Sequence, residues 1–134
     1  MNSAKEIVRS FYETDLIHDV EAFSKYLHPE IILYWNSSFG FNKKDFNDIK
    51  TMFSEMALSF ETFRCEISHL IAEGNSVTIR YTYFAKTIEN PEKEDAIAHF
   101  ITIWELKDDK LYKGYQISQQ GDNTPESMMS FISK

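Results

Sequence analysis

The side chains best suited to acid–base chemistry in this sequence are its histidines and the carboxylates near them. His99 beside a carboxylate could act as a general base, and Asp15, His18 and Asp19 could form an acid–base set. Structural roles compete with both ideas. Asp19 suits a helix N-cap, and a His18 cation would be stabilised at the C-terminal end of the preceding helix. For His99 we favour an interface or structural role.

Metal and thiol chemistry are not indicated. His28 and His69 have no second ligand at metal-binding spacing, and the sequence contains no HxxxH motif or Cys/His cluster. We therefore expect no metal and no cofactor. Cys65 lies in an apolar predicted strand and is interpreted as a small buried hydrophobic residue. A lone cysteine excludes an intramolecular disulfide and fits a reducing compartment.

Composition narrows the class of protein. The formal net charge of −7 disfavours nucleic acid or an anionic membrane as partner. Neither a signal-peptide h-region nor an apolar stretch long enough to span a membrane is visible, so we expect a cytoplasmic protein. The length of 134 residues predicts a single domain over 1–134. Aromatic residues make up 15% of the chain, enough either to fill a core or to line a ligand cavity.

Three segments with apolar residues at helical spacing must help to position these groups. We predict a helix over 4–18 opened by a Ser3 capping box, and a short second helix from Asp19. A third helix is expected to follow an N-cap at Asn42 and to end near residue 59. A short terminal helix is expected to open at Thr124.

The rest of the sequence predicts strands. Runs rich in β-branched and aromatic residues cover 31–35, 63–71, 77–86, 96–107 and 111–119. Tight turns at 73–75 and 108–110 require the later strands to pair antiparallel. The predicted order is therefore α-α-β-α-β-β-β-β, an α+β fold with its helices on one face of a bent sheet.

The strand over 96–107 has no plainly polar face. One parity holds Ala98, Phe100, Thr102 and Trp104, and the other holds His99, Ile101, Ile103 and Glu105. We therefore expect both faces to be covered, one by a core or cavity and the other by a partner subunit.

This order of elements resembles the nuclear transport factor 2-like superfamily. The residues that carry the resemblance are Asp19, His28-Pro29-Glu30, Gly40, Glu73-Gly74-Asn75, His99-Phe100 and Asp109-Lys110-Leu111. It covers nearly the whole chain and is nearest to SnoaL-like polyketide cyclases, ketosteroid isomerases and limonene epoxide hydrolases. It implies a conical barrel, a cystatin-like α+β roll in which three N-terminal helices pack on a strongly curved antiparallel or mixed sheet. The pocket would lie inside the cone.

The catalytic residues of these relatives are not matched. In the register of the resemblance, Phe11 replaces the hydrogen-bonding Tyr of ketosteroid isomerases, Trp35 their base and Ala98 their second acid. Because steroid isomerisation needs a base and an oxyanion hole, we do not expect that activity. Gln119 stands near an Asp of the cyclases and cannot act as a base at neutral pH. The positions assigned inward hold neither the Asp nor the Arg of the epoxide hydrolases.

The same register implies an aromatic pocket for a small apolar or aromatic ligand. Its expected lining is Tyr12, Trp35, Tyr81, Tyr83, Phe100, Thr102, Trp104, Tyr115 and Gln119. An isomerase-, cyclase- or hydrolase-type reaction that relies on hydrogen bonds is one reading. The alternatives are a non-catalytic ligand-binding or dimeric interaction module and a completely filled cone.

The resemblance also implies a homodimer formed through the convex face of the sheet. Arg80, His99, Ile101 and Ile103 would lie on that face. Arg80 could pair across the interface with Glu105 or Glu66, or remain a solvated charge.

Overall fold

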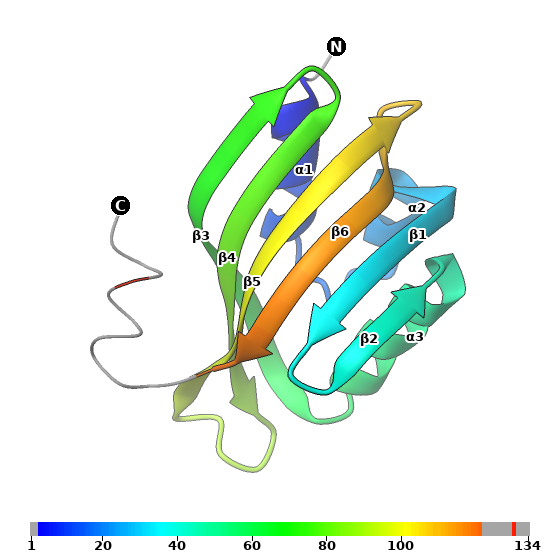
Figure 1. The fold of residues 1–134 in the computed structure, drawn as a ribbon. Helices are drawn as coiled ribbons and strands as arrows, with labels where there is room; N and C mark the ends of the chain where they lie inside the picture. The colour runs from blue at the N-terminus through cyan, green and yellow to red at the C-terminus, as the bar shows by residue number, and fades with distance from the viewer. Residues whose placement is uncertain (1–2, 122–129, 131–134) are drawn as a thin grey trace.

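A computed structural model of the protein describes residues 3–121 and 130. Within this part, three helices all lie on one face of a six-stranded sheet, behind it in Figure 1. We call this the helix-covered face, and the opposite side the outer face. The predicted α+β class and the mixed, curved sheet are confirmed, although the sheet is not closed.

The helices begin close to where the sequence predicts. Helix α1 spans Ala4–Glu13, α2 spans Glu21–Tyr26 and α3 spans Phe46–Met56. The Ser3 hydroxyl accepts a hydrogen bond of 3.2 Å from the Glu6 amide, which confirms the predicted N-cap. The cap of α3 is instead Asp45, which forms a reciprocal capping box with Asp48.

The Asn42 cap was wrong because the residues around it form a strand. The strands are β1 (Leu27–Ser37), β2 (Gly40–Lys44), β3 (Phe60–Glu73), β4 (Ser76–Thr87), β5 (Glu94–Lys107) and β6 (Lys110–Gln120). The sequence predicts a loop and the start of a helix where β2 lies, so the order is corrected to α-α-β-β-α-β-β-β-β. The helix expected at Thr124 lies outside the described residues.

Strand order in the sheet is β2-β1-β6-β5-β4-β3. Strands β1 and β6 run parallel, and every other neighbouring pair is antiparallel. The first and last thirds of the chain therefore meet in the middle of the sheet. Two tight turns join the later strands, with positive φ at Gly74 in one and at Asp108 and Asp109 in the other. Such turns match the twist of a two-stranded ribbon.

A β-bulge in β6 changes which of its side chains face the helices. Leu106 is paired with Leu111, but Glu105 is paired with Lys113, so Tyr112 is the extra residue. Because side chains alternate along a strand, one extra residue moves every later side chain to the other face. A prediction that alternates side chains from the buried Leu111 onward therefore assigns each residue beyond the bulge to the wrong face of the sheet.

The core lies between the helices and the helix-covered face. Helix α1 contributes Val8 and Phe11, which pack over strand positions such as Val77 and Ile79. These side chains are at most 3% exposed. The amphipathic spacing of α1 thus becomes one wall of a closed apolar layer.

Candidate functional site

A cavity of about 300 Å³ remains inside this apolar layer. Helices α1 and α3 form one side of it, and strands β1, β3, β4, β5 and β6 form the other. The lining consists almost entirely of apolar and aromatic side chains: Phe11, Tyr12, Leu27, Leu33, Trp35, Ile49, Met52, Phe53, Met56, Phe60, Phe63, Tyr83, Ile97, Ala98, Phe100, Trp104 and Gln116. Cavities of this size and character are typical of small-molecule sites.

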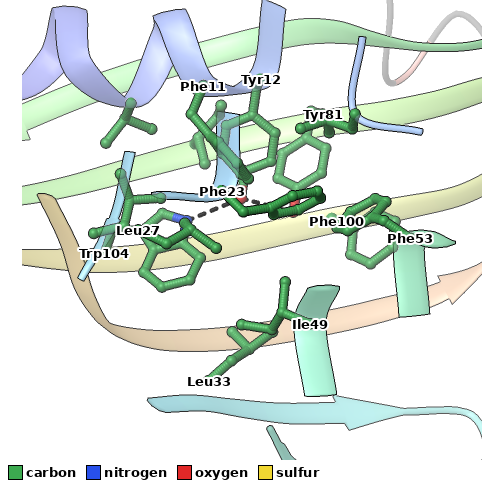
Figure 2. Packing of buried hydrophobic residues seen from close by; sticks show 14 of the residues in the cluster. Phe11, Tyr12, Phe23, Leu27, Leu33, Ile49, Phe53, Tyr81, Phe100 and Trp104 are labelled. Carbon is green, nitrogen blue, oxygen red and sulfur yellow. Dashed lines mark hydrogen bonds between the residues drawn. The ribbon is translucent and has the colours of Figure 1, made fainter. Parts of the chain in front are cut away.

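One wall of the cavity carries a chain of hydrogen bonds that we call the buried polar network. Its members are Tyr12, Tyr81, Thr102, Trp104 and Gln116. The Trp104 indole N–H donates to the Tyr12 hydroxyl at 2.9 Å, and the Tyr12 and Tyr81 hydroxyl oxygens are 3.2 Å apart. Figure 2 shows both contacts, between α1 and the sheet.

Gln116 is where the network ends. Its Oε1 accepts from the Tyr81 hydroxyl at 3.1 Å and from the Thr102 hydroxyl at 2.8 Å. The Tyr12 hydroxyl then donates to Tyr81, whose oxygen also lies 3.0 Å from that of Thr102. Every N–H and O–H of Trp104, Tyr12, Tyr81 and Thr102 is therefore used once. A buried network satisfied in this way holds its side chains in a fixed arrangement.

Burial governs the electrostatics of the cavity. It raises the pKa of Tyr12, Tyr81 and Tyr83 above the ordinary tyrosine value, so these hydroxyls are neutral at physiological pH. Burial likewise raises the pKa of the Cys65 thiol, which makes thiolate chemistry unfavourable there. The lining residues include no Asp, Glu, His, Lys or Arg. The arrangement can orient a ligand by hydrogen bonds but offers no ionised acid or base.

Most of the candidates named from the sequence do meet here. Tyr12, Trp35, Tyr83, Phe100 and Trp104 line the cavity. The Trp35 indole N–H is held by the Ser118 hydroxyl at 2.7 Å. Tyr81 and Thr102 are fully buried members of the polar network and are not themselves lining residues. Whether any of them binds a ligand stays a prediction.

Two residues of β6 that the sequence predicts in the cavity lining lie outside it, which corrects that prediction. Tyr115 is 42% exposed on the outer face, where it stacks on Tyr34, and Gln119 is also exposed. The bulge at Tyr112 brings Gln116 to the cavity instead. Gly114 was the signal that could have located the irregularity, because an interior strand glycine often marks a bulge or close backbone approach.

The acid–base candidates are not part of the cavity. Asp15 and His18 contact each other at 2.8 Å on the surface, and both side chains are more than half exposed. His28 packs against Tyr112, with its Nε2 3.4 Å from Asp108. His99 is buried on the outer-face side, where its Nδ1 lies 2.8 Å from the Thr82 hydroxyl.

The outer face differs in part from expectation. Ile101 and Ile103 are about 40% exposed there, as predicted. His99 is only 2% exposed, so it does not present a free surface. Arg80 donates to the Ser68 hydroxyl at 3.2 Å and to the Ser130 carbonyl oxygen at 2.9 Å. Glu66 forms an ion pair with Arg64 of the same chain. The pairing of Arg80 with Glu105 or Glu66 across an interface stays a prediction.

Among residues 3–121 and 130, no group of three or more His, Cys, Asp or Glu side chains could hold a metal ion. No helix in the same part of the chain is both long and apolar enough to cross a membrane.

Comparison with known proteins adds a family and a fold. Residues 8–113 match the family model of the SnoaL-like domain. None of the curated proteins matches the sequence significantly. Among solved structures, the chain is similar to IdmH from Streptomyces antibioticus, a proposed polyketide cyclase, with a TM-score of 0.72 and 12% identity over 99% of this chain and 100% of IdmH.

Two other similar structures differ in what is said of them. One is a nuclear transport factor 2-like protein of unknown function from Burkholderia pseudomallei, with a TM-score of 0.65 and 13% identity over the whole of both chains. The other is an epoxide hydrolase of M. tuberculosis, with a TM-score of 0.67 and 15% identity over 96% of this chain and 88% of that one. At these identities the likeness extends to the fold alone.

Proposed function

The chain belongs to the SnoaL-like domain family, and on that basis we propose that it binds an uncharged apolar or aromatic small molecule in the cavity. The observation that carries the proposal is the cavity of about 300 Å³, walled by aromatic side chains and closed on one side by the buried polar network. A ligand that fills an apolar space of this size gains packing contacts with the side chains that line it. Polyketide cyclases among the similar structures are compatible with this class of ligand.

We propose binding rather than acid–base catalysis as its role. No carboxylate or imidazole lines the cavity, and its tyrosines are held neutral. An isomerisation, cyclisation or hydrolysis here would have to proceed through hydrogen bonding alone. General acid–base catalysis needs a group that changes protonation near the operating pH.

The binding proposal can be tested with N-phenyl-1-naphthylamine, an uncharged probe that fluoresces in apolar surroundings. We expect saturable fluorescence with the wild-type protein and at least a tenfold weaker response from Ala98→Phe, which fills the cavity. Ala72→Phe makes the same substitution at an exposed strand position and should bind like wild type. Absence of saturable binding, or equal binding by Ala98→Phe, would refute the proposal.

A second candidate function is homodimerisation through the outer face. Ile101, Ile103, Tyr115 and Ile117 are each 40–61% exposed and form one patch, since Ile101 is paired with Ile117 and Ile103 with Tyr115. Glu105 and Lys113 lie at the border of this patch, and a two-fold axis can bring such opposite charges together. We therefore propose a second copy of this chain as the occupant.

This proposal differs from the sequence prediction because it is centred on β5 and β6 and excludes the buried His99. We expect light scattering to report a dimer for the wild type and a monomer for Ile103→Lys. The control is the exposed Leu58→Lys, which lies in the turn after α3 and not on the outer face, and it should remain dimeric. A monomeric wild type at micromolar concentration would rule the dimer out.

A further inference from the structure

We infer that the cavity selects uncharged ligands that carry a hydrogen-bond acceptor such as a ketone carbonyl, and that the Gln116 amide N–H binds this acceptor. The inference rests on the proposed binding function and names the chemical class of its ligand. It gives a role to Gln116, which the β-bulge in β6 places on the helix-covered face.

The geometry of Gln116 carries the inference. Its side chain is only 8% exposed and lies in the cavity wall. Both hydrogen bonds that the structure gives this side chain end on Oε1. Because the two arms of an amide diverge, the Nε2 arm points away from Tyr81 and Thr102. It makes no hydrogen bond to any residue within 3–121 or to Ser130.

A ligand that covers this N–H without accepting a hydrogen bond from it buries an unpaired donor, which costs about as much as a hydrogen bond is worth. A ligand that places an acceptor at Nε2 avoids that cost, whereas a hydrocarbon incurs it. The hydroxyls of Tyr12 and Tyr81 cannot take over this role because both hydrogens are used within the network.

The charge of the ligand is limited by the same wall. No Lys, Arg or His lines the cavity to compensate a carboxylate. Moving an unpaired carboxylate from water into such surroundings is far more costly than moving a carbonyl. The acceptor should therefore be neutral.

A matched set of naphthalenes tests the inference by calorimetric titration of the wild-type protein. The set comprises 2-ethylnaphthalene, 2-acetylnaphthalene, 1-(2-naphthyl)ethanol and 2-naphthoate, which share one ring system. We expect the ketone to bind most tightly, by roughly two- to tenfold over the hydrocarbon. We expect no measurable binding of the carboxylate.

Substitution of Gln116 assigns the preference to its amide. In Gln116→Leu the ratio of ketone to hydrocarbon affinity should fall by the same roughly two- to tenfold. Gln119→Leu makes the same change on the exposed face of the same strand and should keep the wild-type ratio. If Gln116→Leu does not fold, the ranking of the four ligands by wild-type protein still decides the question.

The possible failures can be told apart. If none of the four compounds binds, the proposed binding function itself fails. If the hydrocarbon binds as tightly as the ketone, the cavity binds ligands but the inference is wrong. Tighter binding of the alcohol than of the ketone would mean that Gln116 presents an acceptor to the cavity, which also overturns it.

Discussion

The indole N–H of Trp104 on β5 donates a hydrogen bond of 2.9 Å to the hydroxyl of Tyr12 on α1, in the buried layer between helix and sheet. These residues are 92 positions apart in the sequence. Because the bond is buried, it fixes the rotamers of both side chains and with them one wall of the cavity.

Removal of the Tyr12 hydroxyl should destabilise the protein. Tyr12→Phe leaves the Trp104 N–H without its acceptor in a buried site, so we expect a loss of about 1–3 kcal/mol in the free energy of unfolding. Urea denaturation followed by tryptophan fluorescence measures it. The exposed Tyr115→Phe is the matched control and should change stability by less than about 0.5 kcal/mol. Equal effects of the two substitutions would contradict the structural role of the bond.

Gly114 should tolerate no side chain while Trp104 keeps its place. A Cβ at Gly114 would lie 2.6 Å from Cζ3 of Trp104 and 2.8 Å from Cδ1 of Leu33. Gly114→Ala should therefore cost about 1–3 kcal/mol of unfolding free energy. In a Trp104→Leu background the same substitution should cost clearly less, because the obstructing ring is absent. Strict additivity in this double-mutant cycle would show that the contact does not matter.

Stability should decline in alkaline solution. Burial raises the pKa of Tyr12, Tyr81 and Tyr83 in the folded state above the ordinary value of 10.0. The folded state then keeps protons that the unfolded state releases, so this contribution is complete below pH 10 and is lost as pH rises further. Urea unfolding across this range should show the decline, and Tyr83→Phe should make it shallower. If all seven tyrosines ionised before the protein unfolded, the proposed protection of the buried tyrosines would be contradicted.

A surface ion pair should give a small acid dependence. Arg64 makes two hydrogen bonds to Glu94, of 2.9 and 2.8 Å, and these bonds lower the pKa of Glu94 below 4.5. The stabilisation is present above the unfolded pKa and is lost as pH falls through the folded pKa. Arg64→Met should abolish this dependence and cost under about 1 kcal/mol at neutral pH, because the pair is partly solvated.

The control for that pair is Lys93→Met. Lys93 is 3.6 Å from Asp95, and its side chain is 67% exposed. We expect this substitution to leave both the stability at neutral pH and its acid dependence unchanged. An equal effect of Arg64→Met and Lys93→Met would assign the acid dependence to general surface charge.

The cavity was predictable where one strand could be followed without interruption. In β5, the alternation of Phe100, Thr102 and Trp104 runs unbroken along the helix-covered face, and all three are buried as expected. The buried face of helix α1 was predictable for the same reason, since one apolar stripe holds Ile7, Val8, Phe11 and Tyr12. Regular spacing in these segments fixes a face regardless of what the rest of the chain does.

Prediction failed where backbone irregularity broke the period. Because of the bulge at Tyr112, Gln116 lines the cavity, and the predicted Tyr115 and Gln119 do not. Strand β2 was missed because Gly40, Asn42, Lys43 and Lys44 have low strand propensity, and pairing with β1 overrides it. Both outcomes depend on hydrogen bonds to a neighbouring strand, which local sequence does not encode.

The sequence by itself determined the α+β class and the aromatic content of the cavity, because periodicity and composition are properties of each segment alone. The family followed from the resemblance in the order of its elements and from the match over residues 8–113. Only the tertiary structure decided that Gln116 faces the cavity, that Tyr12 is committed to Trp104 and Tyr81, and that His99 is buried against Thr82. These are pairings between strands and helices distant in sequence. Their geometry follows from register and bulges, and one shifted residue reverses every side chain beyond it.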